Sequence, residues 1–168
     1  MTDDNTWLEL AIALATANVA QGGGPFGAVV VRDGTSIGEG TNRVTAVLDP
    51  TAHAEIMAVR DACRRSGDFR LAGATLYASC EPCPMCLSAL LWARVDRVVF
   101  AADRYAAAEA GFDDAVFHGL LAATAGSWPL RIDQVQVADA VRPFDAWRAE
   151  GARIPYCSGW CCVAGVLN

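Results

Sequence analysis

The sequence has 168 residues, of which 54% are hydrophobic and 19% are charged, so it is long enough for one domain with a sizeable core. The 13 Lys and Arg residues and 19 Asp and Glu residues give a formal net charge of −6, which argues against stable binding to nucleic acid or anionic lipid. An uncharged small molecule fits this composition better as a partner.

The N-terminal residues contain Asp3, Asp4 and Glu9 and lack a basic region, so they do not resemble a secretory signal. No apolar run reaches the length of about 18 residues that a membrane-spanning helix needs. The cysteines are odd in number, 7, and clustered, which argues against a disulfide framework. We therefore expect a cytoplasmic protein with no membrane partner.

The first third of the chain predicts a helix and then a hairpin. A helix is expected over residues 5–21, where apolar residues recur at helical spacing before Gly22-Gly23-Gly24. Residues 26–32 and 35–41 are β-rich runs on either side of Asp33-Gly34, a strong hairpin-turn signal.

The rest of the chain alternates between helices and strands. Thr51 is expected to cap a helix over residues 52–66, and Pro84 to open a helix that ends near Ala93. The other predicted elements are strands over 74–79 and 96–102, a broken helix over 103–125 around Gly111, a strand over 131–137 and a helix from Pro143 to about Glu150. This order predicts a three-layer α/β/α sandwich around a five-stranded mixed sheet.

Two short motifs predict a metal site. His53-Ala54-Glu55 begins one predicted helix, and Cys83-Pro84-Met85-Cys86 begins another after one intervening strand. Helix starts carry unpaired N–H groups and a partial positive charge, which lower thiol pKa values and favour zinc binding. One imidazole and two thiolates leave a fourth tetrahedral position open, as catalytic zinc sites do. We expect His53, Cys83 and Cys86 to bind Zn²⁺ and Glu55 to carry protons.

Simpler interpretations compete with this one. A lone histidine near a helix start is usually structural, and a CxxC pair is also typical of redox proteins. Cys80 forms a second CxxC with Cys83, but it follows a strand rather than opening a helix, so we favour Cys83 and Cys86 as ligands. A structural zinc protein would need a fourth ligand, such as Cys80 or one of the C-terminal cysteines, and would leave Glu55 without a role.

These motifs resemble the signature of the zinc-dependent nucleobase deaminases of the cytidine-deaminase fold. The resemblance is strongest to the bacterial guanine deaminases, and its blocks extend to about Tyr156. The matching blocks are residues 24–29 (GPFGAV), 49–55 (DPTAHAE), 79–86 (SCEPCPMC), 109–114 (EAGFDD) and 143–148 (PFDAWR). It implies one deaminase domain over residues 1–156, followed by an extension over 157–168 of unknown role.

The resemblance also implies an activity and site residues. The reaction would be the zinc-dependent hydrolysis of guanine to xanthine and ammonia, with Glu55 and Asp114 as catalytic residues. Ala54, Asp114 and Tyr156 would contact the base. A homodimer is expected, and in some members of the family the C-terminal segment that corresponds to Tyr156 is exchanged between subunits. Residues 157–168 run past the expected end of such proteins.

Two further substrate contacts are suggested by residue chemistry. Asn42 offers an amide that can both donate and accept at a base edge, although it is also a common turn residue. Phe26 follows Pro25 at the start of a predicted strand and could stack on the base, but a core aromatic is nearly as good an interpretation. Isoguanine, cytosine and aminotriazines present similar edges and remain open as substrates. A tRNA adenosine deaminase shares the zinc motif but should carry a basic surface.

Overall fold

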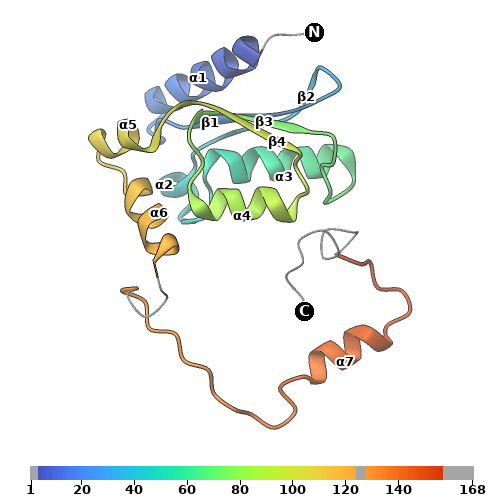
Figure 1. Ribbon diagram of the computed structural model, residues 1–168. Coiled ribbons are helices and arrows are strands. Elements are labelled where there is room, and N and C mark those ends of the chain that lie inside the picture. Colours follow the sequence, from blue (N-terminus) through green and yellow to red (C-terminus); the bar gives the residue numbers. More distant parts are fainter. Residues whose placement is uncertain (1–3, 124–127, 157–168) are drawn as a thin grey trace. The chain divides into compact units, whose positions relative to one another are not determined.

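The computed structural model describes residues 4–123 and 128–156. It consists of two compact units that divide between Trp128 and Pro129. The first unit contains every strand assigned in the described residues (Figure 1). Within the described part of the chain, no helix is both long and apolar enough to span a bilayer.

The first unit is built on a mixed sheet of four strands in the order β2-β1-β3-β4. Its strands are β1 (Gly27–Arg32), β2 (Thr35–Thr41), β3 (Thr75–Cys80) and β4 (Arg97–Ala102). Strand β1 pairs antiparallel with β2 and β3, whereas β3 pairs parallel with β4. The predicted hairpin turn is confirmed, because Asp33 and Gly34 both have positive φ, 51° and 70°.

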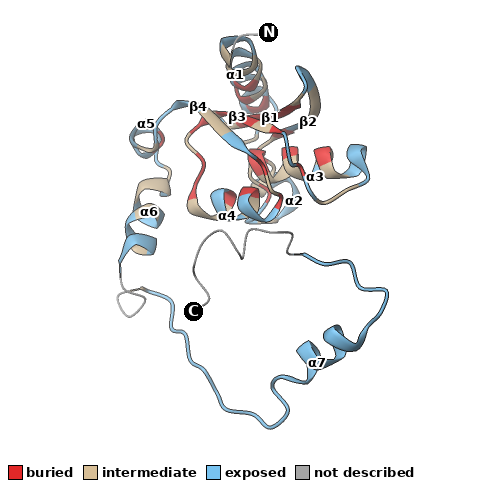
Figure 2. Ribbon diagram, turned by 45° about the vertical axis from the view of Figure 1, so that its right-hand side comes forward, coloured by how far each residue is buried: buried red, intermediate tan, exposed pale blue. Residues whose placement is uncertain are grey.

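Helices cover both faces of this sheet, as a three-layer sandwich requires. The helices in the described residues are α1 (Asp4–Ala20), α2 (Val44–Val47), α3 (Ala54–Ser66), α4 (Pro84–Trp92), α5 (Arg104–Glu109), α6 (Asp114–Ala122) and α7 (Arg142–Ala149). Helix α1 lies on one face, and α3 and α4 lie on the other (Figure 1). Buried residues gather on the two central strands, β1 and β3, and on the inner faces of α1, α3 and α4 (Figure 2).

The alternation of side chains along β1 explains the two core layers. Val29 packs with Ala11 of α1 and Tyr77 of β3 on one face. Val30, the next residue, joins Leu76 and the α3 side on the other face. Burial of apolar side chains on both faces therefore holds α1 and α3 against the same central strands.

Helix α3 lies unusually close to β2 because the strand presents glycines to it. A Cβ placed on Gly40 would lie 2.2 Å from the Ala54 carbonyl oxygen, and one on Gly38 would lie 2.7 Å from the Ala62 Cβ. Only a residue without a side chain fits these two positions. This close packing fixes the start of α3, where the predicted metal ligand and proton carrier lie.

Three sequence predictions need correction. The sheet has four strands rather than five, because residues 131–137 are not a strand. They lie in the second unit, whose described residues provide no neighbouring strand to complete the hydrogen bonds of a ladder. Helix α2 occupies part of the predicted loop over 43–50, and α3 begins at Ala54 rather than 52. The break near Gly111, which has φ +92°, and helix α7 agree with the predictions.

Candidate metal and active site

His53 and Glu55 lie at the N-terminus of α3. His53, not Thr51, is the N-cap residue, with an extended backbone at φ −68° and ψ 158°. The Thr51 hydroxyl donates to Asp49 Oδ1 at 2.7 Å instead, and this local turn delays the start of the helix. The imidazole therefore stands just before the helix, and Glu55 follows in its first turn with only 7% of its surface exposed.

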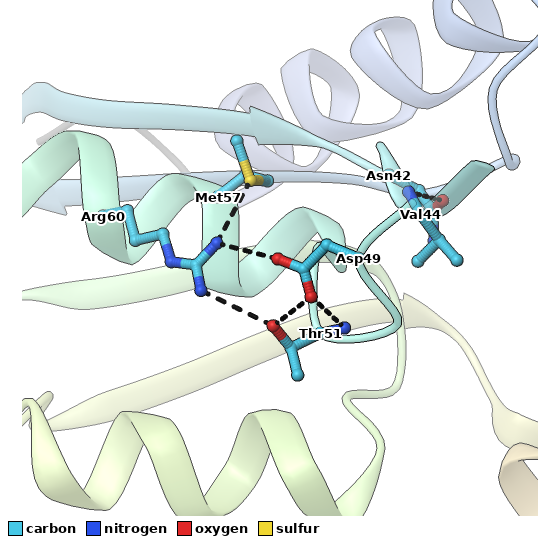
Figure 3. Close-up of polar contacts among 6 residues, drawn as sticks. All are labelled: Asn42, Val44, Asp49, Thr51, Met57 and Arg60. Carbon is cyan, nitrogen blue, oxygen red and sulfur yellow. Dashed lines mark hydrogen bonds and ion pairs between the residues drawn. The ribbon is translucent and has the colours of Figure 1, made fainter. Parts of the chain in front are cut away.

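Polar contacts brace the loop that leads into α3 (Figure 3). Asp49 Oδ1 also accepts the Thr51 backbone N–H at 2.8 Å, which closes a tight turn. From the second turn of α3, Arg60 pairs with Asp49 Oδ2 at 3.4 Å. At the other end of the loop, Asn42 Oδ1 accepts the Val44 N–H at 3.2 Å, which fixes the orientation of the Asn42 amide.

The two cysteines lie at the N-terminus of α4. Cys83 is the N-cap residue, Pro84 is the first helical residue as predicted, and Cys86 lies in the first turn. Both thiols are buried. Cys80 ends β3 and donates from its Sγ to the Asp103 carbonyl oxygen at 3.5 Å, away from this pair. The geometry therefore agrees with Cys83 and Cys86, rather than Cys80, as ligands.

The starts of α3 and α4 bring three ligand atoms together. Cys83 Sγ lies 3.6 Å from both His53 Nδ1 and Cys86 Sγ, and Cys86 Sγ lies 3.7 Å from His53 Nδ1. Tetrahedral zinc, with Zn–S of about 2.3 Å and Zn–N of about 2.0 Å, places its sulfurs about 3.8 Å apart and nitrogen about 3.5 Å from sulfur. The observed triangle thus fits zinc, and these three residues form the only such cluster in the described residues.

The charges in this cluster favour a cation. Hydrogen bonding with Cys86 and with His53 lowers the pKa of the Cys83 thiol well below its ordinary value. The same contact with Cys83, together with burial, raises the pKa of Cys86, because two adjacent thiolates repel each other. Contact with Cys83 raises the pKa of His53. A divalent cation would remove this conflict by taking both thiolates and the neutral imidazole as ligands.

Glu55 has the electrostatics of a proton carrier. Burial raises the pKa of its carboxyl group from about 4.5 to about 7. At that value the group can give up and take back a proton near neutral pH, as general acid–base catalysis requires. It lies beside the cluster, where it interacts with Cys86 and Cys83.

A pocket of about 230 Å³ opens beside the cluster. Its lining residues are Gly24, Phe26, Asn42, Val44, Thr45, His53, Glu55, Glu81, Cys83, Phe112 and Asp114. The Phe26 and Phe112 rings meet edge to face with their centroids 4.8 Å apart and form one wall. Burial, followed by the negative charge of Cys83, raises the pKa of the Asp114 carboxyl group.

The structure brings together most of the predicted site residues. Phe26, Asn42 and Asp114 line the pocket with His53 and Glu55. Ala54 is only 1% exposed, so its side chain belongs to the core and only its backbone could meet a ligand. Tyr156 lies in the second unit, where its ring is 5.9 Å from that of Trp147. The predicted extension over 157–168 falls outside the described residues.

Sequence reasoning missed several lining residues. Phe112 belongs to the EAGFDD block, but only its contact with Phe26 shows that it forms a wall. Glu81 stands between two cysteines in the SCEPCPMC block, and it forms an ion pair with Arg104 that joins the Cys83 loop to α5. Gly24, Val44 and Thr45 carry no chemical signal of their own and are revealed only by the fold.

A larger hollow of about 680 Å³ lies between α1, β4 and α5. It shares Phe26 and Phe112 with the pocket, but its lining is almost wholly apolar and includes none of the three ligand residues. Its lining contains no carboxylate and no histidine, and Cys80 is the one thiol in it, so we place the active site in the smaller pocket.

Comparison with known proteins gives a consistent result. Residues 1–102 match the family described as the cytidine and deoxycytidylate deaminase zinc-binding region. A guanine deaminase of Bacillus subtilis is 49% identical over 144 residues, which are 85% of this chain and 92% of that protein. The X-ray structure of guanine deaminase from Bacillus subtilis superposes with a TM-score of 0.88 and covers 93% of this chain and all of that one, at 45% identity.

The more distant relatives include proteins with a second activity, tRNA-specific adenosine deamination. A structure of guanine deaminase from Nitrosomonas europaea matches with a TM-score of 0.65 at 34% identity, over 68% of this chain and 66% of that one. A tRNA-specific adenosine deaminase of Haemophilus influenzae is 40% identical over 129 residues, which are 73% of this chain and 75% of that protein. The match to the guanine deaminase of Bacillus subtilis extends over more of this chain than the match to the tRNA-specific adenosine deaminase does.

Proposed function

This chain belongs to the cytidine and deoxycytidylate deaminase zinc-binding family, and we propose that it hydrolyses guanine to xanthine and ammonia. The observation that carries this substrate is the 49% identity to a guanine deaminase over nearly the whole length of both chains. Water adds at C2 of the base and the amino group leaves as ammonia, so the atoms of guanine and one water are all accounted for.

The lining of the pocket supports a free base as the substrate. Its volume of about 230 Å³ is below the roughly 300–1,000 Å³ of pockets that hold drug-sized ligands. Guanine offers N1–H and an exocyclic amine as donors, which the Asp114 carboxylate can accept. The Asn42 amide can donate and accept at another edge. Phe26 and Phe112 supply an apolar wall for the ring.

We assign the metal to His53, Cys83 and Cys86. The distances among their ligand atoms suit tetrahedral zinc, and three protein ligands leave one position for another ligand. When bound, zinc supplies Lewis acidity, which lets water ionise near neutral pH. Because Cys83 and Cys86 lie at the N-terminus of α4, the partial positive charge of the helix start favours the thiolate forms that bind a cation.

Glu55 is proposed to move the protons. Its buried carboxyl group, with a pKa of about 7, would take a proton from the attacking water and deliver it to a ring nitrogen. It would then carry the proton of the new C2 hydroxyl group to the departing amine, which leaves as ammonia. Asp114 is proposed as a second acidic group that holds the amine and assists its departure. Ala54 is proposed to contact the base through its backbone at the start of α3.

The tRNA-editing alternative has the sequence match to tRNA-specific adenosine deaminases in its favour. A polyanionic substrate needs Lys and Arg side chains to neutralise its phosphates, whereas this chain has a net charge of −6. We therefore propose a small-molecule substrate and no nucleic-acid partner. Isoguanine, cytosine and aminotriazines are the competitors that the same pocket chemistry could accept.

We also propose a homodimer in which the C-terminal segment is exchanged, so that Tyr156 of one subunit would reach the pocket of the other. Helix α7 supports this as an interface element, because Phe144 and Trp147 lie three residues apart on one side of it. We expect the enzyme to act in the cytoplasm, where Cys63, Cys80 and the ligand thiols would stay reduced.

A substrate panel tests the proposal. Purified zinc-loaded protein is given guanine, isoguanine, cytosine, an aminotriazine and a tRNA anticodon stem-loop, and ammonia or inosine is measured. Guanine should give the highest kcat/KM. Turnover of another base without guanine, or editing of the stem-loop, would reject guanine as the substrate.

A further inference from the structure

Asn18, near the end of α1, is a buried amide with two backbone acceptors. It is 2% exposed. Its Nδ2 donates to the Gly24 carbonyl oxygen at 2.8 Å and to the Asn42 carbonyl oxygen at 2.9 Å. Because both acceptors are carbonyls, the NH₂ end of the amide must face them. Asn18 thus uses both of its N–H groups to join two segments that are distant in sequence.

Both acceptor residues line the candidate pocket, whereas Asn18 does not. Asn42 is held from three directions: its N–H donates to the Phe26 carbonyl at 3.1 Å, its side-chain Oδ1 accepts from Val44, and its carbonyl accepts from Asn18. Without Asn18, the Asn42 carbonyl would be buried without this donor, and the backbone that aims the Asn42 amide would lose one of its supports.

The glycines before Pro25 are shaped around these two amides. A Cβ on Gly23 would lie 2.3 Å from Asn18 Nδ2, and one on Gly24 would lie 3.1 Å from Asn42 Cγ. Gly23 also donates its N–H to the Asn18 carbonyl at 2.9 Å, which ties the turn to the end of α1. The turn can pass this close to the two asparagines only because it lacks side chains at these positions.

We propose that Asn18 is a positioning residue for substrate binding. It holds the Asn42 side-chain amide and the Gly24 backbone, which both line the pocket, at the separation that the base requires. This inference rests on the proposed function, because Asn42 must contact the base. Asn18 acts through other residues and lies on α1, far in sequence from the zinc motifs. Its removal should therefore weaken substrate binding more than it slows the chemical step.

Steady-state kinetics of Asn18→Ala test this role. The loss of donors to two buried carbonyls should raise KM for guanine by about tenfold and leave kcat within about threefold. The matched control is Tyr77→Phe, which removes a buried donor to Asp4 at 2.7 Å at the other end of α1. Tyr77→Phe should leave KM unchanged, and both variants should retain zinc. An unchanged KM in Asn18→Ala, or an equal rise in both variants, would overturn the proposal.

Gly23→Ala tests the same contact from the other side and serves if Asn18→Ala does not fold. Its Cβ should displace the Asn18 amide and again raise KM by about tenfold. Its control is Gly22→Asn in the same turn, because Gly22 has φ +80°, which Asn tolerates, and a Cβ there meets nothing within 4 Å. A normal KM in Gly23→Ala, or a raised one in Gly22→Asn, would contradict the assignment.

Amide hydrogen exchange separates this proposal from the proposed function. If the wild-type protein fails to deaminate guanine, the proposed function is wrong, but exchange of the Asn42 backbone N–H can still be measured. Its exchange should be at least about tenfold faster in Asn18→Ala than in Tyr77→Phe, since a support of this backbone segment is lost. Equal exchange in the two variants would show that Asn18 does not hold Asn42.

Discussion

Replacing Gly40 with Ala tests whether the close packing of α3 on β2 sets the metal site. The new Cβ would lie 2.2 Å from the Ala54 carbonyl oxygen and 2.4 Å from the Ala58 nitrogen, both of which are backbone atoms that cannot rotate away. To restore an ordinary van der Waals distance, α3 must retreat by about 1 Å, and overpacking of this kind costs about 1–3 kcal/mol of stability.

The retreat should be felt at the site because Ala54 stands between His53 and Glu55. A displacement of about 1 Å in catalytic groups can cost about 10²-fold in rate, and it would also spoil the ligand triangle of His53, Cys83 and Cys86. We therefore expect Gly40→Ala to lower the free energy of unfolding, the zinc content and kcat/KM together.

Urea unfolding, zinc analysis and deaminase kinetics measure these three effects. Gly119→Ala is the matched control, because a Cβ on Gly119 in α6 meets nothing within 4 Å. It should be neutral or stabilising by up to about 1 kcal/mol, since alanine favours the helix. Wild-type stability and zinc content in Gly40→Ala would refute the view that this packing positions the ligands.

Three further predictions concern the site directly. Glu55→Gln should lower kcat by about 10²–10⁴ while zinc, measured by atomic emission, is retained, and unchanged ammonia release would exclude Glu55 as the proton carrier. Removal of zinc by a chelator should lower Tm by about 5–10 °C, with recovery when zinc but not magnesium is added; an identical Tm before and after chelation would speak against a bound metal. Glu81→Gln should destabilise the fold at neutral pH by about 1–2 kcal/mol, because the hydrogen bond and ion pair with Arg104 lower the pKa of the Glu81 carboxyl group. That stabilisation is complete above about pH 4.5, the ordinary value for glutamate, and disappears as the pH falls through the lower pKa of the folded state. The stability difference between wild type and Glu81→Gln should therefore shrink in acid, and a difference that is constant down to pH 3 would contradict this account.

Local patterns were sufficient to predict the elements that carry the ligands. Asp33-Gly34 supplies a turn that needs two residues with positive φ, and Pro84 suits the first turn of a helix, so the hairpin and the start of α4 could be placed from sequence. The cap of α3 could not, because Thr51 had two possible partners. Its hydroxyl bonds Asp49 rather than a helix N–H, and the choice depends on the whole turn.

Features that depend on tertiary contacts could not be predicted. The segment 131–137 has a strand-like pattern, but a strand also needs a neighbour, and its own unit provides none in the described residues. Phe112 and Glu81 gain their roles from Phe26 and Arg104, which are distant in sequence. Asn18 looks like an ordinary polar residue near a helix end until its carbonyl partners are seen.

Small residues in α3 and β2 connect the fold to the chemistry. Ala54, Ala58 and Ala62 recur every four residues along α3, so they form one side of the helix, and it faces the glycines of β2. The helix and the strand touch through backbone atoms, so no side-chain rotation can make room between them. The first turn of α3 therefore has little freedom to move. Rigidity at this place is what three ligands from two helices require, because each must arrive at the same ion without reorganisation. A substitution that enlarges any of these small residues should therefore impair metal binding even though none of them is a ligand.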